Sequence, residues 1–548
     1  MRNIKSILAL LALLFSVMMS LPFLVPHLGF LALAGFVPLL LMEAVADAHG
    51  VRRFFWWQYL AFVLWNAFTT FWVCNATVGG GIFAIVANAA QMSVIFAAYR
   101  YSRKRFSPVL SLIFLAVLWI AWERLYFDAQ ISWPWLVLGN AFARDIRCIQ
   151  WYEYTGTLGG SLWIWASNIS LFLILKALMQ GDFQVLSAKA RGVAAAAAAF
   201  IIAAPFIWSF HIWNSFEERS EGKMDVIIAQ PDFDPYMKFQ SLSQAQQDVI
   251  LIDMLEKGLR AHRPGAPTLI LAPETFTNDI VLGKVEEGYT WNRMRGFLEN
   301  YPDANLLFGA SAHEFFTTPE APSVLAWQLR DGRWVESRNT GVIMDRTGRT
   351  EMYHKSKLVV GVEMTPYPRF FTKIDDKLGH VMGRCIGQDE ISLLNAVSYD
   401  GNGNVDRSIP LGCIICYESI YGEFCTGYVK AGAKALAVIT NDAWWGNTPG
   451  YRQHLSYASL RAIETRRDIA RCANTGISGF INQRGEISGE STWWEQEVLG
   501  GQVNLNSEET FFVRNGDIPG RICCFVALLL LALCLTRTVL ITTQNNKR

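Results

Sequence analysis

Apolar residues are concentrated at the two ends of this chain, and a long stretch of mixed polar and apolar composition separates them. Eight apolar runs predict membrane-spanning helices, at 7–21, 29–45, 55–73, 81–98, 109–122, 161–178, 193–210 and 522–541. Several runs are shorter than the ~20 residues that a straight span needs, so one re-entrant segment is an open alternative. The pattern predicts a transmembrane domain over 1–216, a soluble domain over 217–517, and a last transmembrane helix with a tail over 518–548.

Basic residues cluster in every second loop between these runs, which the positive-inside rule assigns to the cytoplasm. Both termini are therefore expected in the cytoplasm and the soluble domain on the opposite side. The first run has the basic start and short apolar core of a signal peptide, but no small-x-small cleavage site is evident after Met19, so an uncleaved helix is expected. The clustered residues are Arg2, Lys5, Arg52, Arg53, Arg100, Arg103, Lys104, Arg105, Lys176, Lys189, Arg191, Arg537, Lys547 and Arg548.

Between 224 and 487, short apolar runs alternate with polar helical stretches, the pattern of an α/β domain. Helices are expected at 242–262 and 451–468. Strands are expected at 224–231, 268–276, 304–311, 339–345, 357–363, 409–416, 434–442 and 477–487. About 290 residues are enough for one large domain with a single core.

The composition of the 548 residues, 52% hydrophobic and 17% charged, is too apolar for an ordinary soluble protein. A net charge of +1 and the lack of a basic stripe give no reason to expect a nucleic-acid partner.

Cys416 ends the apolar run 411–415, where a thiol on a rigid strand can act as a nucleophile. Cys413 completes a C-x-x-C, which raises the alternatives of a redox pair or half a zinc site. The two isoleucines between the cysteines favour a strand with the sulfurs on opposite faces, and the other eight cysteines offer no second pair.

Glu274 and Lys355 also stand at or directly after predicted strands. With Cys416 they supply an acid–base group, a fixed cation and a nucleophile, the minimum set for acyl transfer through a thioester. His354 and His454 raise a Cys–His alternative, although neither carries a motif of its own.

The motifs LAPET, YHKSKLV, CYES, TNDAWWG and NTGISGF, in this order, resemble the nitrilase superfamily. Within it, the membrane-embedded arrangement is similar to the bacterial apolipoprotein N-acyltransferases. The resemblance covers nearly the whole chain and implies an αββα four-layer sandwich attached to a membrane domain of about eight helices.

The resemblance assigns roles to particular residues: Glu274 as general base, Lys355 as transition-state lysine, Cys416 as nucleophile, and Glu363 and Glu418 as supporting glutamates. The backbone N–H of Tyr417 is a candidate second oxyanion donor. Two departures concern the acyl-chain pocket: LVVGVE replaces LVPFGE, and Lys238-Phe239 replaces a Lys-Trp pair. Phe239, Trp444 and Trp445 are therefore candidate substrate contacts, with core or rim packing as the alternative.

The resemblance implies that a membrane phospholipid donates an acyl chain to Cys416 and that the α-amino group of a diacylglyceryl-cysteine on an apolipoprotein accepts it. It also implies a bacterial inner-membrane protein with a periplasmic catalytic domain and no metal or organic cofactor. A membrane-anchored hydrolase of the amidase or nitrilase type and a non-catalytic lipid-binding relative remain alternatives. Residues 364–371 are expected to form a lid or lipid-entry segment, or to pack against the membrane domain.

Overall fold

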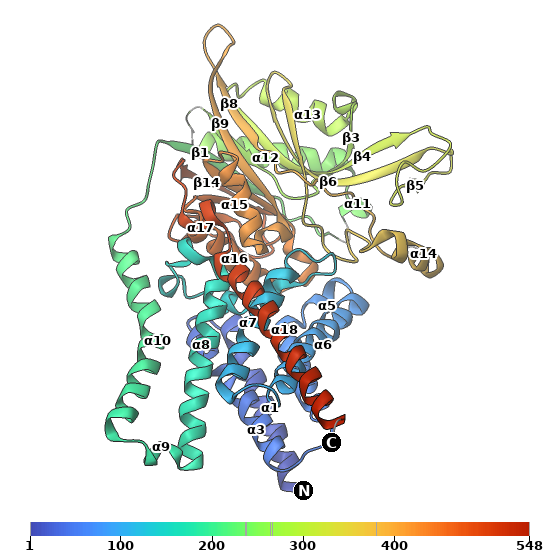
Figure 1. The fold of residues 1–548 in the computed structure, drawn as a ribbon. Coiled ribbons are helices and arrows are strands. Elements are labelled where there is room, and N and C mark those ends of the chain that lie inside the picture. Colours follow the sequence, from blue (N-terminus) through green and yellow to red (C-terminus); the bar gives the residue numbers. More distant parts are fainter. Residues whose placement is uncertain (1, 236–237, 263–264, 266, 380, 547–548) are drawn as a thin grey trace. The chain divides into compact units, whose positions relative to one another are not determined.

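The computed structural model describes residues 2–235, 238–262, 265, 267–379 and 381–546. The chain divides into two compact units (Figure 1), one formed by Met1–Phe216 with Asn515–Arg548 and the other by Glu217–Arg514. We describe each unit separately.

The first unit is helical, and the described residues contain 7 helices long and apolar enough to cross a membrane. The second of these spans, Gly29–Ala48, combines η1 (Gly29–Leu31), α2 (Ala32–Gly35) and α3 (Val37–Ala48). The others are α1 (Arg2–Leu24), α6 (Val78–Ser102), α7 (Pro108–Tyr126), α8 (Tyr152–Gln180), α10 (Ala188–Ser215) and α18 (Ile518–Asn546).

The run expected to span the membrane at 55–73 forms a shorter element. Helix α4 (Phe55–Thr70) has 16 residues and ends before the separate helix α5 (Val73–Ala76) begins. At 1.5 Å per residue α4 is about 24 Å long, less than the apolar thickness of a typical bilayer. The remaining short helices of this unit are η2 (Pro134–Leu136), η3 (Leu138–Phe142), η4 (Ile146–Cys148) and α9 (Asp182–Val185).

The second unit contains two β-sheets. The first has eight strands in the order β14-β1-β2-β4-β6-β5, with β3 paired to β4 and β7 paired to β6. Its strands are β1 (Lys223–Gln230), β2 (Thr268–Leu271), β3 (Thr277–Val281), β4 (Ala304–Phe316), β5 (Trp327–Gln328), β6 (Trp334–Asp345), β7 (Thr350–His354) and β14 (Glu497–Asn504).

The second sheet has six strands in the order β13-β12-β11-β10-β9-β8. Strands β9, β10 and β11 are parallel, so their carboxyl ends lie at one edge. The strands are β8 (Leu394–Tyr399), β9 (Val405–Ile415), β10 (Ala435–Thr440), β11 (Ile469–Ala473), β12 (Gly479–Ile481) and β13 (Ile487–Ser488).

Helices cover the outer faces of the two sheets. Helices α12 (Gln244–His262) and α13 (Tyr289–Leu298) pack on the first sheet, and α15 (Gly422–Lys430) and α16 (Pro449–Thr465) pack on the second. Because side chains alternate along a strand, Val226 and Ile228 enter the core between the sheets while Ile227 and Ala229 pack under the helices. This αββα sandwich confirms the predicted fold class.

The other helices of this unit are α11 (Lys238–Ser241), η5 (Val285–Glu287), α14 (Pro368–Leu378), η6 (Cys416–Ile420), η7 (Asp442–Trp445) and α17 (Phe511–Asn515).

The prediction of a strand at 357–363 is wrong. Only an isolated bridge from Val360 to Met364 forms there, and Gly361 adopts a positive φ of 80° inside a turn. The apolar residues suggested a strand, but Glu363 folds back so that its Oε2 accepts a hydrogen bond from the Val359 N–H at 2.7 Å.

Candidate active site

Cys416 lies where β9 turns into the short helix η6. The strand before it is buried from Leu411 to Ile415, and Cys416 itself has a φ of +50°, unusual for a residue other than glycine. Ile415 pairs with Ile439 of the parallel strand β10, so Thr440 lies beside Cys416. The sheet thus presents the thiol at its carboxyl edge on a sharply turned backbone.

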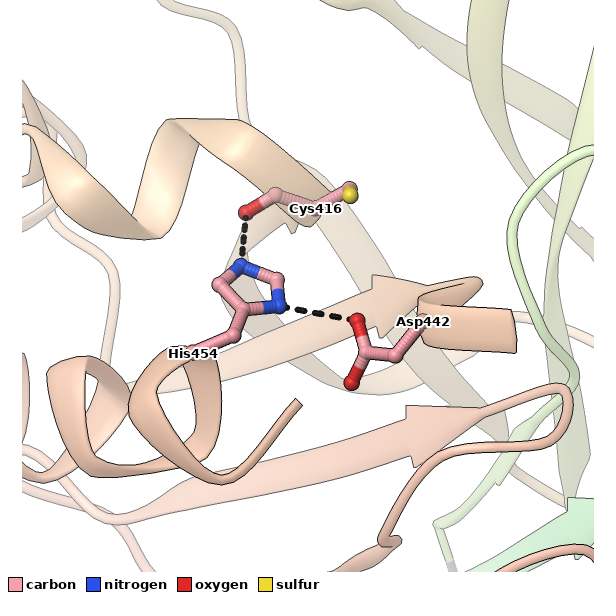
Figure 2. A group of neighbouring side chains, drawn as sticks. All are labelled: Cys416, Asp442 and His454. Carbon is pink, nitrogen blue, oxygen red and sulfur yellow. Dashed lines mark hydrogen bonds and ion pairs between the residues drawn. The ribbon is translucent and has the colours of Figure 1, made fainter. Parts of the chain in front are cut away.

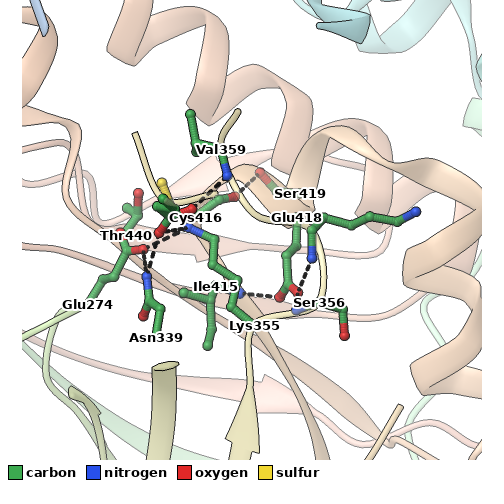
Figure 3. A network of polar contacts seen from close by, with 12 residues as sticks. Glu274, Asn339, Lys355, Ser356, Val359, Ile415, Cys416, Glu418, Ser419 and Thr440 are labelled. Atoms are coloured by element: carbon green, nitrogen blue, oxygen red, sulfur yellow. Dashed lines mark hydrogen bonds and ion pairs between the residues drawn. The ribbon is translucent and has the colours of Figure 1, made fainter. Parts of the chain in front are cut away.

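Lys355 is buried between the carboxylates of Glu274, labelled in Figure 3, and Glu363. Its Nζ lies 3.0 Å from Oε1 of Glu274 and 2.8 Å from Oε1 of Glu363, and the residue is 1% exposed. Glu274 follows β2 and Lys355 follows β7, and both strands belong to the first sheet. The structure therefore brings Glu274, Lys355 and Glu363 together.

Asn339 is a site residue that sequence reasoning missed. Strand β6 places it beside Lys355, whose backbone N–H donates to the Asn339 carbonyl at 2.8 Å. Its side-chain Nδ2 donates to Oε1 of Glu274 at 2.7 Å and to Oε1 of Glu363 at 2.8 Å. Asn339 opens the predicted strand 339–345 without a motif of its own, so only the sheet register reveals its position.

Charges in the site favour a cationic lysine beside an uncharged thiol. Burial alone would lower the pKa of Lys355, but Glu274 and Glu363 raise it well above its usual value. Burial, and after it the charge of Glu274, raises the pKa of the Cys416 thiol well above its usual value. The charge of Lys355 acts to lower this pKa but does not offset the increase. The resting thiol therefore needs a base to remove its proton.

Glu418 connects the two loops that carry Lys355 and Cys416. Its Oε1 accepts from the Tyr353 hydroxyl at 2.6 Å and from the Ser356 N–H at 2.7 Å, while Oε2 accepts from the Ile415 N–H at 2.8 Å. The side chain is fully buried, and burial raises its pKa. Glu418 thus fixes the spacing between the loops of Lys355 and Cys416.

His454 contacts the main chain of Cys416 (Figure 2). Its Nε2 lies 3.0 Å from the Cys416 carbonyl oxygen, and its Nδ1 lies 2.9 Å from Oδ1 of Asp442. Ligand atoms of Cys416, Asp442 and His454 all lie within 4.8 Å of one another, which makes the group a formal candidate for a metal. Because both ring nitrogens already have polar partners, we favour neither a metal site nor a Cys–His pair.

The C-x-x-C cysteines lie in different surroundings. Cys413 is buried in β9, where its Sγ lies 2.7 Å from the position that a Cβ on Gly341 would take, so it packs against the first sheet. All ten cysteines, which fall within the described residues, are free thiols.

Three further residues were named as candidates for substrate contact. The side chain of Phe239, in α11, lies outside the described residues. Trp445 packs edge-on against His454, with ring centroids 5.4 Å apart, and Trp444 is 39% exposed beside it. His354 faces Thr340 instead of Cys416, with Nδ1 and Oγ1 2.8 Å apart, and burial with Arg338 lowers its pKa to about 4.

Replacing Asn339 by leucine is expected to slow the reaction at this site about 10²-fold, because misplacing a catalytic group by 1 Å costs this much. The two carboxylates would lose the donor that spaces them. The measurement is the single-turnover rate of the reaction at this site. Asn305→Leu is the matched control: Asn305 is also a buried strand residue, but it bonds the backbone of Val397. It should lower the free energy of unfolding and leave the rate within a few fold, and an equal rate loss in both variants would contradict a specific role for Asn339.

Comparisons with known proteins match both parts of the chain to described families. Residues 15–170 match the family described as apolipoprotein N-acyltransferase N-terminal domain, and residues 323–511 match the carbon-nitrogen hydrolase family. The second match includes Lys355, Glu363, Cys416 and Glu418.

Similar curated proteins span almost the whole chain. The apolipoprotein N-acyltransferase of Chlorobaculum tepidum is 28% identical over 515 residues, covering 91% of this chain and 91% of that protein. That of Geobacter metallireducens is 26% identical over 538 residues, covering 96% and 95%. Among solved structures, Nit3 of Saccharomyces cerevisiae, a member of the nitrilase superfamily, aligns with a TM-score of 0.38 and 13% identity over 53% of this chain and 93% of Nit3. Both domain families are matched in order, and the relatives that span almost the whole chain share one name, so the chain is similar to the apolipoprotein N-acyltransferases over both of its domains.

Proposed function

We propose that this protein moves a fatty acyl chain from a membrane phospholipid, through a thioester on Cys416, to the α-amino group of the diacylglyceryl-cysteine that begins an apolipoprotein. The observation that carries the proposal is the buried ion pair of Lys355 and Glu274, at 3.0 Å, in the same site as the Cys416 thiol. The names of the full-length relatives supply the acceptor.

In the first half-reaction, Glu274 takes the proton from the Cys416 thiol while the sulfur attacks the ester carbonyl carbon of the phospholipid. The oxyanion that forms is stabilised by the Lys355 ammonium and the Tyr417 N–H. The carbon–oxygen bond to the glycerol then breaks, and Glu274 returns the proton to the leaving oxygen. The products are a lysophospholipid and a thioester on Cys416.

In the second half-reaction, the neutral α-amine attacks the thioester carbonyl carbon and gives one proton to Glu274. The carbon–sulfur bond breaks, the proton returns to the Cys416 sulfur, and an amide remains on the lipoprotein. Lys355 and Asn339 both donate hydrogen bonds to Oε1 of Glu274. We therefore assign the proton that Glu274 takes up and returns to its other carboxylate oxygen, Oε2.

Both substrates reside in a bilayer, which accounts for a chain whose first unit contains 7 helices able to cross a membrane. We further propose that the protein lies in the bacterial inner membrane, with α4 and α5 together forming an eighth crossing, both termini in the cytoplasm and the catalytic unit in the periplasm. The alternation of basic loops supports this orientation.

Intact-mass spectrometry tests the first half-reaction. Detergent-purified protein incubated with a phospholipid should gain the mass of one acyl chain, and hydroxylamine should remove it because thioesters are cleaved by this nucleophile. Release of free fatty acid in place of a stable adduct would favour a hydrolase. No adduct and no fatty acid, from folded protein offered several phospholipids, would favour a non-catalytic lipid-binding protein.

A further inference from the structure

One face of helix α16 holds the backbone of the turn that carries the nucleophile. His454 and Arg461 are seven residues apart, two turns of an α-helix, so both point to the same side. Both are 1% exposed. Arg461 Nη1 donates to the carbonyl of Ser419 at 2.8 Å and to that of Ile420 at 2.9 Å, and His454 contacts the carbonyl of Cys416.

The contact of His454 with Cys416 has a defined direction. A carbonyl oxygen only accepts hydrogen bonds, so Nε2–H of His454 is the donor over 3.0 Å. The Ser419 hydroxyl donates to the same oxygen at 2.9 Å, and its Oγ lies 2.9 Å from Nε2. The Cys416 carbonyl is therefore held from two sides.

Buried charges hold the imidazole in place. Nδ1 lies 2.9 Å from Oδ1 of Asp442, and Oδ2 of Asp442 accepts from Nη2 of Arg471 at 2.8 Å. All three residues are at most 1% exposed. Burial would raise the pKa of Asp442, but Arg471 and His454 hold it well below its usual range, so the carboxylate stays charged.

Fixing the Cys416 carbonyl also fixes the next N–H. In a trans peptide the C=O of one residue and the N–H of the following residue point in opposite directions in one plane. The Tyr417 N–H therefore points away from His454. The φ of +50° at Cys416 is costly for a residue with a side chain, so this orientation needs support from outside the turn.

We propose that His454, held by Asp442 and Arg471, is a positioning residue that aims the Tyr417 N–H at the oxyanion formed on the acyl group. The assignment rests on the proposed function for the substrate and on the hydrogen bonds of α16 for the geometry. His454 acts through the peptide of Cys416 and takes no proton from the thiol.

Two substitutions of His454 separate this role from others. Gln can place its amide N–H near the position of Nε2 and keep the bond to Cys416, whereas Asn reaches only the position of Nδ1 and keeps only the contact with Asp442. His454→Asn should lower the acylation rate about 10²-fold, the usual cost of losing an oxyanion donor, with KM for the phospholipid nearly unchanged. His454→Gln should lose no more than about 10-fold, the effect of one weakened hydrogen bond. Rates come from the mass of the acyl adduct over time with a dipalmitoyl phospholipid in detergent micelles.

Alkylation of Cys416 by iodoacetamide supplies the second readout. Displacement of iodide forms no oxyanion, so His454→Asn should be alkylated within about 3-fold of the unchanged rate while its acylation falls. If His454 were instead a general base, both substitutions would slow both acylation and alkylation. His313→Gln is the matched control, because this half-buried histidine pairs with Ser337 on another strand, and it should leave both rates unchanged.

The outcomes separate the two proposals. If the unchanged protein forms no acyl adduct, the proposed function fails. If the unchanged protein forms the adduct, two results would show that the positioning role is wrong. One is a His454→Asn variant that is acylated at the normal rate, and the other is a His454→Gln variant that loses as much rate as His454→Asn. Equal loss of acylation and alkylation with a fall in Tm would indicate a structural role alone.

Discussion

Cys416→Ala protein should form no acyl adduct with any phospholipid and should transfer no acyl chain to a lipopeptide. Loss of a catalytic nucleophile typically lowers turnover by about 10⁴–10⁶-fold, because only the binding and oxyanion contributions remain. The fold should survive, since Cys416 is a small side chain at the edge of the core and alanine removes the sulfur alone. The measurements are intact mass after incubation with phospholipid, and N-acylation of a synthetic diacylated lipopeptide.

Cys413→Ala is the matched control for this variant. Cys413 lies three residues earlier on β9 and is fully buried against the first sheet near Gly341. Its loss should lower the free energy of unfolding by about 1 kcal/mol through a small cavity, and the acylation rate should stay within a few fold. A Cys413→Ala variant that cannot be acylated would revive the dithiol interpretation of the C-x-x-C.

Lys355→Met should reduce both catalysis and stability. Removing the ammonium takes away the proposed oxyanion contact, which typically costs about 10²–10³ in rate. It also leaves the buried Glu274 and the partly buried Glu363 as neighbouring carboxylates that share Asn339 as donor. Breaking a buried ion pair from one side typically costs about 3–5 kcal/mol, so Tm should fall clearly. Thermal unfolding in detergent and the acylation rate measure the two effects.

Lys257→Met provides the comparison on the surface. Lys257 pairs with Asp253 at 2.6 Å on the exposed side of α12, and surface pairs contribute about 0–1 kcal/mol. Neither the rate nor Tm should change appreciably. A Lys355→Met protein with normal Tm and a normal rate would show that the buried cation serves neither role.

Much of the catalytic unit can be predicted from local pattern. Strand β10 and the buried parts of β1 and β9 are apolar runs, and α12 and α16 are bounded by polar or proline-containing turns, so the pattern predicts them. The strand ends at Glu274 and Cys416 are visible for the same reason. The third partner, Lys355, was predicted from its motif and the resemblance, not from burial.

Other parts depend on tertiary contacts that no local pattern contains. Strand β11 carries the fully buried Arg471, and this one charged residue interrupts what would otherwise read as an apolar run. The 357–363 segment has strand composition, yet the attraction of Glu363 to Lys355 folds it into a turn. Asn339 is a single polar residue whose contacts depend on the sheet register, and only the structure reveals it. His454 is visible in the sequence as a possible Cys–His partner, but its contact with the Cys416 carbonyl depends on the packing of α16.

The measurement that tests the central proposal most directly is a chase of isolated acyl-enzyme. Protein acylated by phospholipid is separated from free lipid and mixed with a diacylated lipopeptide that has a free N-terminal α-amine, with no phospholipid present. Loss of the acyl mass from the protein and gain of the same mass on the peptide amine, at equal rates in one turnover, is the predicted result. If the acyl mass stays on the protein, or appears as free fatty acid while the peptide is unmodified, the thioester on Cys416 is not an intermediate of N-acyl transfer.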